Sequence, residues 1–150
     1  MDYILQLRQH IGHRPILMVG AAILVLDAQD RLLMMKRSDN GRWGLPGGAT
    51  EPGEIVEEAA RRETLEETNL QVKEMSLFGV FSGPGLYYKY PNGDEVYNVT
   101  IMYLSRDWLG EIKLNHEHSE WKWFPAGELP DNVSPPIKPI IEQFKSSFTT

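Results

Sequence analysis

The fold of this chain is organised by one segment, Gly47-Gly48-Ala49-Thr50-Glu51-Pro52-Gly53-Glu54, which continues directly into Ile55 to Leu70. The first part is a glycine-rich loop. From Glu54 to Thr68 the chain has no Pro or Gly and is rich in Glu, Ala, Arg and Leu, so we predict a helix there. Pro52 before this run and Asn69 after it are residues typical of helix ends.

Three carboxylates of the predicted helix share one face. At about 100° per residue, Glu66 and Glu67 lie about 60° and 40° from Glu63, one on each side. The apolar stripe falls on this same side and consists of Ile55, Val56, Ala59 and Ala60, whereas Glu54, Glu57, Glu58 and Arg61 point away. A surface helix normally separates its apolar stripe from its charges, and an unpaired inward charge is costly. Divalent cations would compensate, because Mg²⁺ binds carboxylate and phosphate oxygens; the alternative is a solvated acidic helix without a site.

The spacing in this segment resembles the signature box of the MutT-like Nudix hydrolases. The matching residues, separated by five, seven, two and one residues, are Gly48, Glu54, Arg62-Glu63, Glu66-Glu67 and Asn69-Leu70. Two positions depart from the strictest form of the box, with Thr64 in place of an aliphatic residue and Asn69 in place of Gly. Asn is the next best residue for a left-handed helix end, and Thr64 carries none of the chemistry.

The resemblance implies an α/β fold, a Nudix-type α/β/α sandwich with a mixed β-sheet. It also implies a Mg²⁺-dependent hydrolase, with Mn²⁺ as the alternative cofactor, that cleaves a diphosphate linkage in a nucleoside diphosphate derivative. The candidate substrates are a nucleoside triphosphate, a dinucleoside polyphosphate or an ADP-ribose-like compound. The alternative from another class is a catalytically silent nucleotide-binding or sensing module of the same fold.

The same resemblance assigns roles to residues of the box. The metal ligands are expected from the helix and the glycine turn: Glu63, Glu66, Glu67, Gly47 and Gly48. Arg62 is expected to orient one of these carboxylates, and Glu66 lies four residues on, within reach of its side chain. Glu54, which we count on the substrate side, is expected to tie the loop to the helix.

One more carboxylate is expected from the acidic loop Asn115-His116-Glu117-His118-Ser119-Glu120. Glu117 is preferred, because Glu120 adjoins a predicted strand and fits an edge charge or a substrate contact. Glu66 and Glu117 are both candidates for the base that takes the proton from water. The two histidines raise a transition-metal cluster as an alternative, but we expect them to be solvated or to contact substrate.

Recognition residues lie outside the box and leave alternatives open. Arg37 ends a predicted strand and either contacts substrate phosphate or is a surface charge. Tyr87 and Tyr88 lie 17 and 18 residues beyond Leu70 and either stack on a base or pack within a strand. Trp43 is expected to pack in the core or line the mouth of the site.

Composition indicates a single domain over residues 1–150, able to bury about 68–70% of its unfolded surface. The chain has 41% hydrophobic and 24% charged residues, no cysteine and a net charge of −6. Seven glutamates between Glu51 and Glu67 argue against non-specific binding to a nucleic-acid backbone. We expect a small-molecule nucleotide as partner, no membrane association, a monomer or homodimer, and a cytoplasmic location.

The remaining pattern predicts where the main elements lie. Asp2 to Ile11 reads as a helix that closes one end of the core. The apolar run Ile16 to Leu26 could be taken for a signal peptide, but it has no cleavage site and is too short to span a membrane, so we predict a buried strand. Across the turn at 27–30 it is expected to pair antiparallel with Arg31 to Arg37. Further expected elements are strands at Gln71 to Ser82, Glu95 to Ser105 and Trp121 to Phe124, and a last helix opened by Pro135-Pro136.

Overall fold

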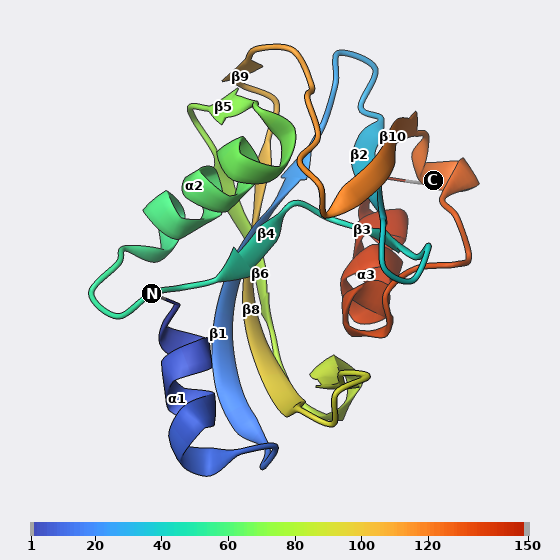
Figure 1. Ribbon diagram of the computed structural model, residues 1–150. Helices are drawn as coiled ribbons and strands as arrows, with labels where there is room; N and C mark the ends of the chain where they lie inside the picture. Colours follow the sequence, from blue (N-terminus) through green and yellow to red (C-terminus); the bar gives the residue numbers. More distant parts are fainter. Residues whose placement is uncertain (1, 149–150) are drawn as a thin grey trace.

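The computed structural model describes residues 2–148, which form helical layers on both faces of a central sheet (Figure 1). The helices are α1 (Tyr3–Ile11), α2 (Val56–Thr68) and α3 (Lys138–Phe148), with short 3-10 helices η1 (Pro84–Leu86), η2 (Ala126–Glu128) and η3 (Pro135–Ile137). The strands are β1 (Ile16–Val25), β2 (Leu32–Arg37), β3 (Trp43–Gly44), β4 (Gly47–Ala49), β5 (Gln71–Val72), β6 (Ser76–Phe81), β7 (Tyr87–Lys89), β8 (Glu95–Ser105), β9 (Trp108–Leu109) and β10 (His118–Phe124).

The central sheet is mixed. Its strand order is β4-β1-β8-β6, and β7 also pairs with β8. Strands β1 and β8 run parallel along the whole of β1, whereas the other pairs in this sheet are antiparallel. A smaller sheet, β10-β2-β3, stands beside it, and β5 pairs with β9.

Alternation along β1 sends successive side chains into two separate cores. On one face, Ala59 and Ala60 of α2 pack in a cluster with Ala21, Ile23 and Val25. On the other face, the α3 residues Ile140, Ile141 and Phe144 pack in a cluster with Ala22, Leu24 and Met102. Helices α2 and α3 therefore cover opposite faces, and the predicted α/β/α sandwich with a mixed sheet is confirmed.

The predicted pairing of the first two strands was wrong. Strands β1 and β2 belong to different sheets, and an isolated antiparallel bridge between Leu26 and Leu32 links the two sheets. The apolar run of β1 instead lies inside the central sheet, with β8 on one side and β4 on the other. The turn at 27–30 thus carries the chain from one sheet to the next.

The strand predicted over Gln71 to Ser82 is broken in two by residues 73–75. The Lys73 N–H donates to the carbonyl of Asp107 at 2.8 Å and the Glu74 N–H to its carboxylate at 3.1 Å. These hydrogen bonds fix the break between β5 and β6. The strand at Glu95 to Ser105 has the predicted bounds, and the last helix begins at Lys138 after the 3-10 turn η3.

Helix α1 does not close the core as predicted, because none of its residues is buried. It lies beside β1, at the lower left of Figure 1, and its Tyr3 N–H donates to a carboxylate oxygen of Glu51 at 3.2 Å. The expected inward position of Ile55 was also wrong, since this residue is 61% exposed. None of the helices within residues 2–148 is long and apolar enough to cross a membrane.

Candidate active site

A pair of glycines lets α2 lie close against β4. A Cβ atom on Gly48 would stand 2.5 Å from the carboxyl carbon of Glu63, and one on Gly47 would stand 2.7 Å from the carbonyl oxygen of Ala21. No larger residue fits at either position without displacing its neighbours. The Gly47 N–H also donates to Glu67 Oε1 at 2.8 Å. The glycine turn and the carboxylate face of α2 are therefore built as one unit.

The three glutamates of this face differ in exposure. Glu67 is 6% exposed, whereas the side chains of Glu63 and Glu66 are 19% and 54% exposed. Burial, with smaller contributions from the Glu63 and Glu117 carboxylates, raises the pKa of Glu67 to about 8, although the Gly47 N–H opposes this. Burial also raises the pKa of Glu63, against the effect of Arg62. Buried carboxylates with too little positive charge around them fit a divalent cation.

Arg62 joins the loop to the helix. Its guanidinium binds the Glu54 carboxylate through two contacts, Nε to Oε2 at 2.7 Å and Nη2 to Oε1 at 3.0 Å. Its Nη1 contacts Glu63 Oε1 at 3.0 Å and Glu66 Oε1 at 3.4 Å. Glu54 Oε1 also accepts the N–H of Glu51 at 3.1 Å. Glu54 thus links the β4–α2 loop to Arg62, which in turn positions Glu63.

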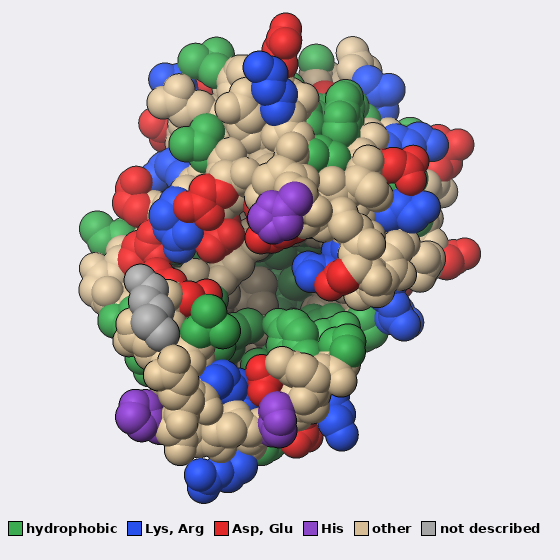
Figure 2. Space-filling view, in the orientation of Figure 1, with side chains coloured by type: hydrophobic (Ala, Val, Ile, Leu, Met, Phe, Trp, Pro, Cys, Tyr) green, Lys and Arg blue, Asp and Glu red, His purple; other side chains and the backbone are tan. Residues whose placement is uncertain are grey.

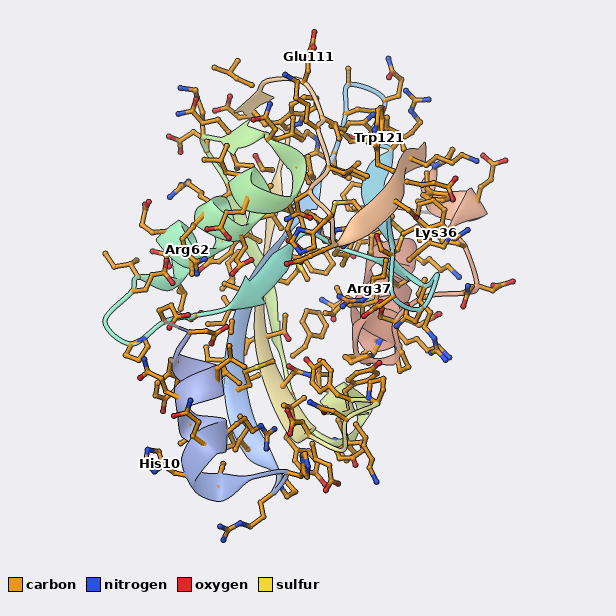
Figure 3. The ribbon with its side chains drawn as sticks, in the orientation of Figure 1. His10, Lys36, Arg37, Arg62, Glu111 and Trp121 are labelled. Carbon is orange, nitrogen blue, oxygen red and sulfur yellow. The ribbon has the colours of Figure 1, made fainter. Side chains whose placement is uncertain are left out.

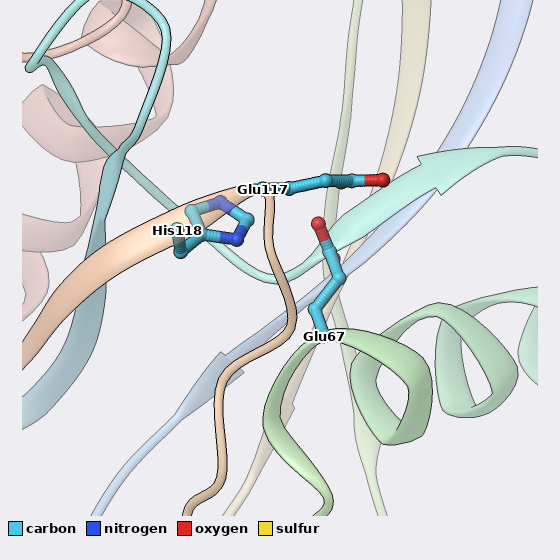
Figure 4. A group of neighbouring side chains, drawn as sticks. All are labelled: Glu67, Glu117 and His118. Atoms are coloured by element: carbon cyan, nitrogen blue, oxygen red, sulfur yellow. The ribbon is translucent and has the colours of Figure 1, made fainter.

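A second segment brings Glu117 and His118 to Glu67. One ligand atom from each of these three side chains lies within 4.8 Å of the others (Figure 4). Asn115 holds this loop, because its Nδ2 donates to the Glu66 carbonyl at 3.3 Å and its Oδ1 accepts the Glu117 N–H at 3.0 Å. Burial and the charge of Arg37 lower the pKa of His118, although Glu117 and Asp39 oppose this shift.

Glu67 and His118 border a cavity of about 520 Å³, here called the main cavity. Figure 2 shows the hollow at the middle of one face, with acidic side chains on one side and apolar side chains below. Its polar lining includes Gly47, Gly48, Glu67, Asn98, Thr100, His118 and Arg37. Ile4 and Leu5 of α1 and Ile140 of α3 supply apolar walls. The main cavity has room for a small organic ligand with a charged end at α2.

Arg37 stands at the end of β2 and lines the main cavity and a smaller one of about 170 Å³, here called the side cavity. Asp39 binds its guanidinium twice, at Nε (3.0 Å) and Nη2 (2.9 Å). Figure 3 shows Arg62 on α2 and Arg37 at the far side of this region. Tyr88 and Tyr90 line the side cavity and meet edge to face, with ring centroids 4.8 Å apart.

Two of the predicted site residues make their contacts away from the glycine turn and the carboxylate face of α2. The Tyr87 hydroxyl donates to Glu95 Oε1 at 2.6 Å, and its ring packs on Tyr97 at 5.1 Å, so it serves the strand pair β7–β8. Glu120 is exposed and pairs with Lys36 Nζ at 3.2 Å, as expected for a charge at a strand edge. The structure does bring together the predicted residues Gly47, Gly48, Glu54, Arg62, Glu63, Glu66, Glu67 and Glu117. The predicted residues Arg37 and Tyr88 line the side cavity.

Sequence reasoning missed the part of the lining that β8 and the loop before it supply. Asn98, Thr100 and Met102 alternate on the face of β8 that lines the main cavity. Asn98 and Thr100, two polar residues in the middle of a strand that is mostly apolar between its ends, were the available signal. Tyr90, in the loop before β8, lines both cavities.

A cavity over a mixed sheet, bordered by the Glu67 carboxylate of α2 and close to Glu117 in the facing loop, defines a site for cation-assisted chemistry on an anionic substrate. The family model described as NUDIX domain matches residues 16–144. The chain belongs to this family.

Individual relatives agree with this placement. The chain is 34% identical over 128 residues to a putative 8-oxo-dGTP diphosphatase of Bacillus subtilis, which covers 85% of this chain and 79% of that protein. It is 36% identical over 109 residues to an ADP-ribose pyrophosphatase of Methanocaldococcus jannaschii, covering 71% of this chain and 61% of that one. A crystal structure of a MutT NUDIX hydrolase from Burkholderia pseudomallei superposes with a TM-score of 0.72 at 28% identity, covering 87% and 98% of the two chains.

Proposed function

We propose that this protein is a Mg²⁺-dependent pyrophosphohydrolase, with Mn²⁺ as the alternative cofactor, that cleaves a diphosphate linkage in a nucleoside diphosphate derivative. The observation that carries the proposal is that Glu67 of α2 contacts the Gly47 N–H at the wall of the main cavity, with Glu63 beside it and Glu117 facing it. The named relatives are a putative 8-oxo-dGTP diphosphatase and an ADP-ribose pyrophosphatase. The two compounds in those names, together with dinucleoside polyphosphates, are the candidate substrates.

The residues of the site have separate roles in the proposed reaction. Glu63, Glu66 and Glu67 would hold the cation, with the carbonyl of Gly47 or Gly48. A bound divalent cation neutralises phosphate oxygens and lowers the pKa of water. Arg62 fixes the orientation of Glu63 through the contact at 3.0 Å.

The proposed reaction has two further requirements, a proton acceptor and a phosphate contact. Glu66 or Glu117 would take the proton from the attacking water. Arg37 would contact a phosphate oxygen, for which a guanidinium already oriented by Asp39 is suited.

A substrate panel tests the proposal. Purified protein is incubated with Mg²⁺ or Mn²⁺ and a nucleoside triphosphate, 8-oxo-dGTP, ADP-ribose, a nucleotide sugar, a dinucleoside polyphosphate or 5′-triphosphorylated RNA. We expect hydrolysis of at least one compound, and ¹⁸O-labelled water would then identify the attacked phosphorus. Tight nucleotide binding without product after long incubation would contradict the proposal and favour a silent binding module.

Replacing one carboxylate tests the assignment within the helix. Glu66→Gln keeps the size of a largely exposed side chain, so the fold should survive. We expect turnover to fall by about 10²-fold or more, because a cation ligand or base is lost. The matched control is Glu120→Gln, which removes an exposed carboxylate paired with Lys36. A Glu66→Gln protein with full activity would refute the role of Glu66.

Three properties stay predictions: one domain over residues 1–150, a monomer or homodimer, and a cytoplasmic location. Light scattering after size-exclusion chromatography measures the oligomeric state directly.

A further inference from the structure

Strand β1 contains a glycine that the packing of the protein itself does not require. Gly20 interrupts the apolar run of β1, although glycine weakens the interior of a strand. Its backbone does not have the positive φ that favours glycine. A Cβ atom on Gly20 would lie 3.5 Å from the Gly48 carbonyl oxygen, which is an ordinary van der Waals contact. Because Gly20 lines the main cavity, its missing side chain leaves space on the floor of that cavity.

Two polar side chains of β8 border this space. Thr100 is opposite Gly20 in the parallel β1–β8 register, and Asn98 lies two residues before Thr100 on the same face. Asn98 Nδ2 donates to the carbonyl of Leu86 at 2.9 Å, and Leu86 is 2% exposed. A carbonyl can only accept, so this contact fixes which end of the Asn98 amide is the donor. The Asn98 Oδ1 atom therefore faces away from Leu86.

The Asn98 Oδ1 and Thr100 Oγ1 atoms are available to a ligand. Within residues 2–148 neither atom has a hydrogen-bond partner in the protein, and neither is closed off from solvent. The fixed Asn98 amide offers an acceptor and so requires a donor on the ligand, whereas the Thr100 hydroxyl can donate or accept. Neither side chain is charged, so this part of the main cavity suits an uncharged polar group rather than a phosphate.

The neighbouring side chains fit the flat faces of an aromatic ring. Met18 of β1 and Met102 of β8 line the main cavity on the same face as Gly20, and Ile140 lines it from α3. Methionine sulfur makes favourable contacts with aromatic rings. Gly20 pairs with Ala49 of β4, at the end of the glycine turn. A ring that lies over Gly20 therefore adjoins the position proposed for the phosphates of a nucleotide.

We propose that Gly20, Asn98 and Thr100 form a subsite for a purine base, in which Asn98 Oδ1 accepts a hydrogen bond from the exocyclic amino group of the base. The base lies over Gly20, and Thr100 Oγ1 contacts its edge. Asn98 is then a specificity-determining residue, because a base without the amino group leaves the Oδ1 acceptor unpaired. The inference rests on the proposed function for a nucleotide as the ligand, and it narrows the substrates to nucleotides of aminopurines.

Binding is measured without hydrolysis, by titrating nucleoside monophosphates into the protein in EDTA. Two pairs of probes each differ by one amino group: AMP against purine riboside monophosphate, and GMP against inosine monophosphate. We expect wild-type protein to bind the amino member of at least one pair roughly tenfold more tightly. Asn98→Leu should bind both members of that pair equally. The matched control is Asn132→Leu, which loses a similar contact with the Gly41 carbonyl (3.1 Å) outside both cavities and should keep the difference.

A second variant separates binding from folding. The protein has room for the methyl group of Gly20→Ala, so its Tm should be unchanged or slightly higher than that of the wild type. The same methyl group stands where the ring would lie, so the affinity for the preferred monophosphate should fall by at least about tenfold. The matched control is Gly127→Ala, because a Cβ atom on Gly127 has no neighbour within 4 Å.

Nuclear magnetic resonance on wild-type protein tests the contact itself, since the side-chain amide signals of Asn98 should move when the amino probe binds. A folded Gly20→Ala protein with wild-type affinity, or wild-type protein that does not distinguish the members of either pair, would overturn the inference. Selective binding that needs Asn98, with no hydrolysis of any panel compound, would support the inference and reject the proposed function. Hydrolysis of panel compounds at rates that do not depend on the base would do the reverse.

Discussion

Glu67 is held in an environment that disfavours its own charge when no cation is bound. Its folded pKa is about 8, above the value of 4.5 for a free glutamate, so the folded state holds a proton that the unfolded state releases in this range. The stabilising contribution of that proton is fully present below about pH 4.5 and is lost as the pH rises through about 8. We therefore expect metal-free protein to lose stability across this window.

Glu67→Gln removes the charge and keeps the acceptor for the Gly47 N–H. In EDTA at pH 9 the variant should be more stable than wild type by on the order of a few kcal/mol, since one pKa unit corresponds to about 1.4 kcal/mol. At pH 4.5 the two proteins should be nearly equal. Urea unfolding at both pH values measures the difference, with Glu120→Gln as an exposed control. A Glu67→Gln protein less stable than wild type at pH 9 would contradict the burial argument.

The face that helical residues share could be predicted from the sequence, whereas the direction in which neighbouring strand side chains point could not. Helical periodicity placed Glu63, Glu66 and Glu67 on one face, because that face is a property of the helix itself. Tyr87 and Tyr88 could not be separated in the same way. Adjacent strand residues point to opposite faces, and which one meets the cavity depends on the pairing of β7 with β8.

In the segment from β4 to α2, the Arg62 side chain links the loop to the helix. Arg62→Lys keeps the charge but loses the planar fork that contacts Glu54 twice. We expect kcat to fall by roughly tenfold to a hundredfold. The stability loss should be only about 1 kcal/mol, since the guanidinium is partly exposed and screened.

The neighbouring Arg61 supplies the control for this element. It contacts Glu58 and the Lys73 carbonyl, away from the cavity, so Arg61→Lys should leave kcat unchanged. Steady-state kinetics and protease sensitivity of the loop at 50–55 measure both effects. Equal kcat in the two variants would show that the tie to Glu54 does not position the site.

Elements were predicted well where their signal is local. Asn69 ends α2 in the left-handed conformation with φ of 68°, as its place after the acidic run indicated. The pairing of Ile16 to Leu26 with the next strand failed because a short turn usually joins partners in one sheet. Here the partner that buries β1 is β8, which lies about 80 residues further on in sequence.

The cavity as a whole is assembled from segments that are distant in sequence, which explains why only part of it could be foreseen. Its walls come from α1, β1, β2, the glycine turn, α2, β8 and α3. The residues of the signature box have a characteristic spacing that is visible in the sequence itself. Apolar wall residues such as Ile4 and Leu5 carry no chemical signature, and their place depends on how α1 docks beside β1.

In the proposed site the cation joins the carboxylates of α2 to the glycine turn, so a bound cation should stabilise the whole folded domain. Mg²⁺ at about 100 times its Kd adds about 2.7 kcal/mol to the free energy of unfolding when it binds only the folded state. For a domain of this size each kcal/mol raises Tm by roughly 2–4 °C, so a rise of roughly 5–11 °C is expected. Scanning calorimetry in MgCl₂, against NaCl of equal ionic strength, separates specific binding from screening of the net charge of −6. Equal Tm values in the two salts would mean that the carboxylates of α2 hold no cation, and the proposed active centre would have to be placed elsewhere.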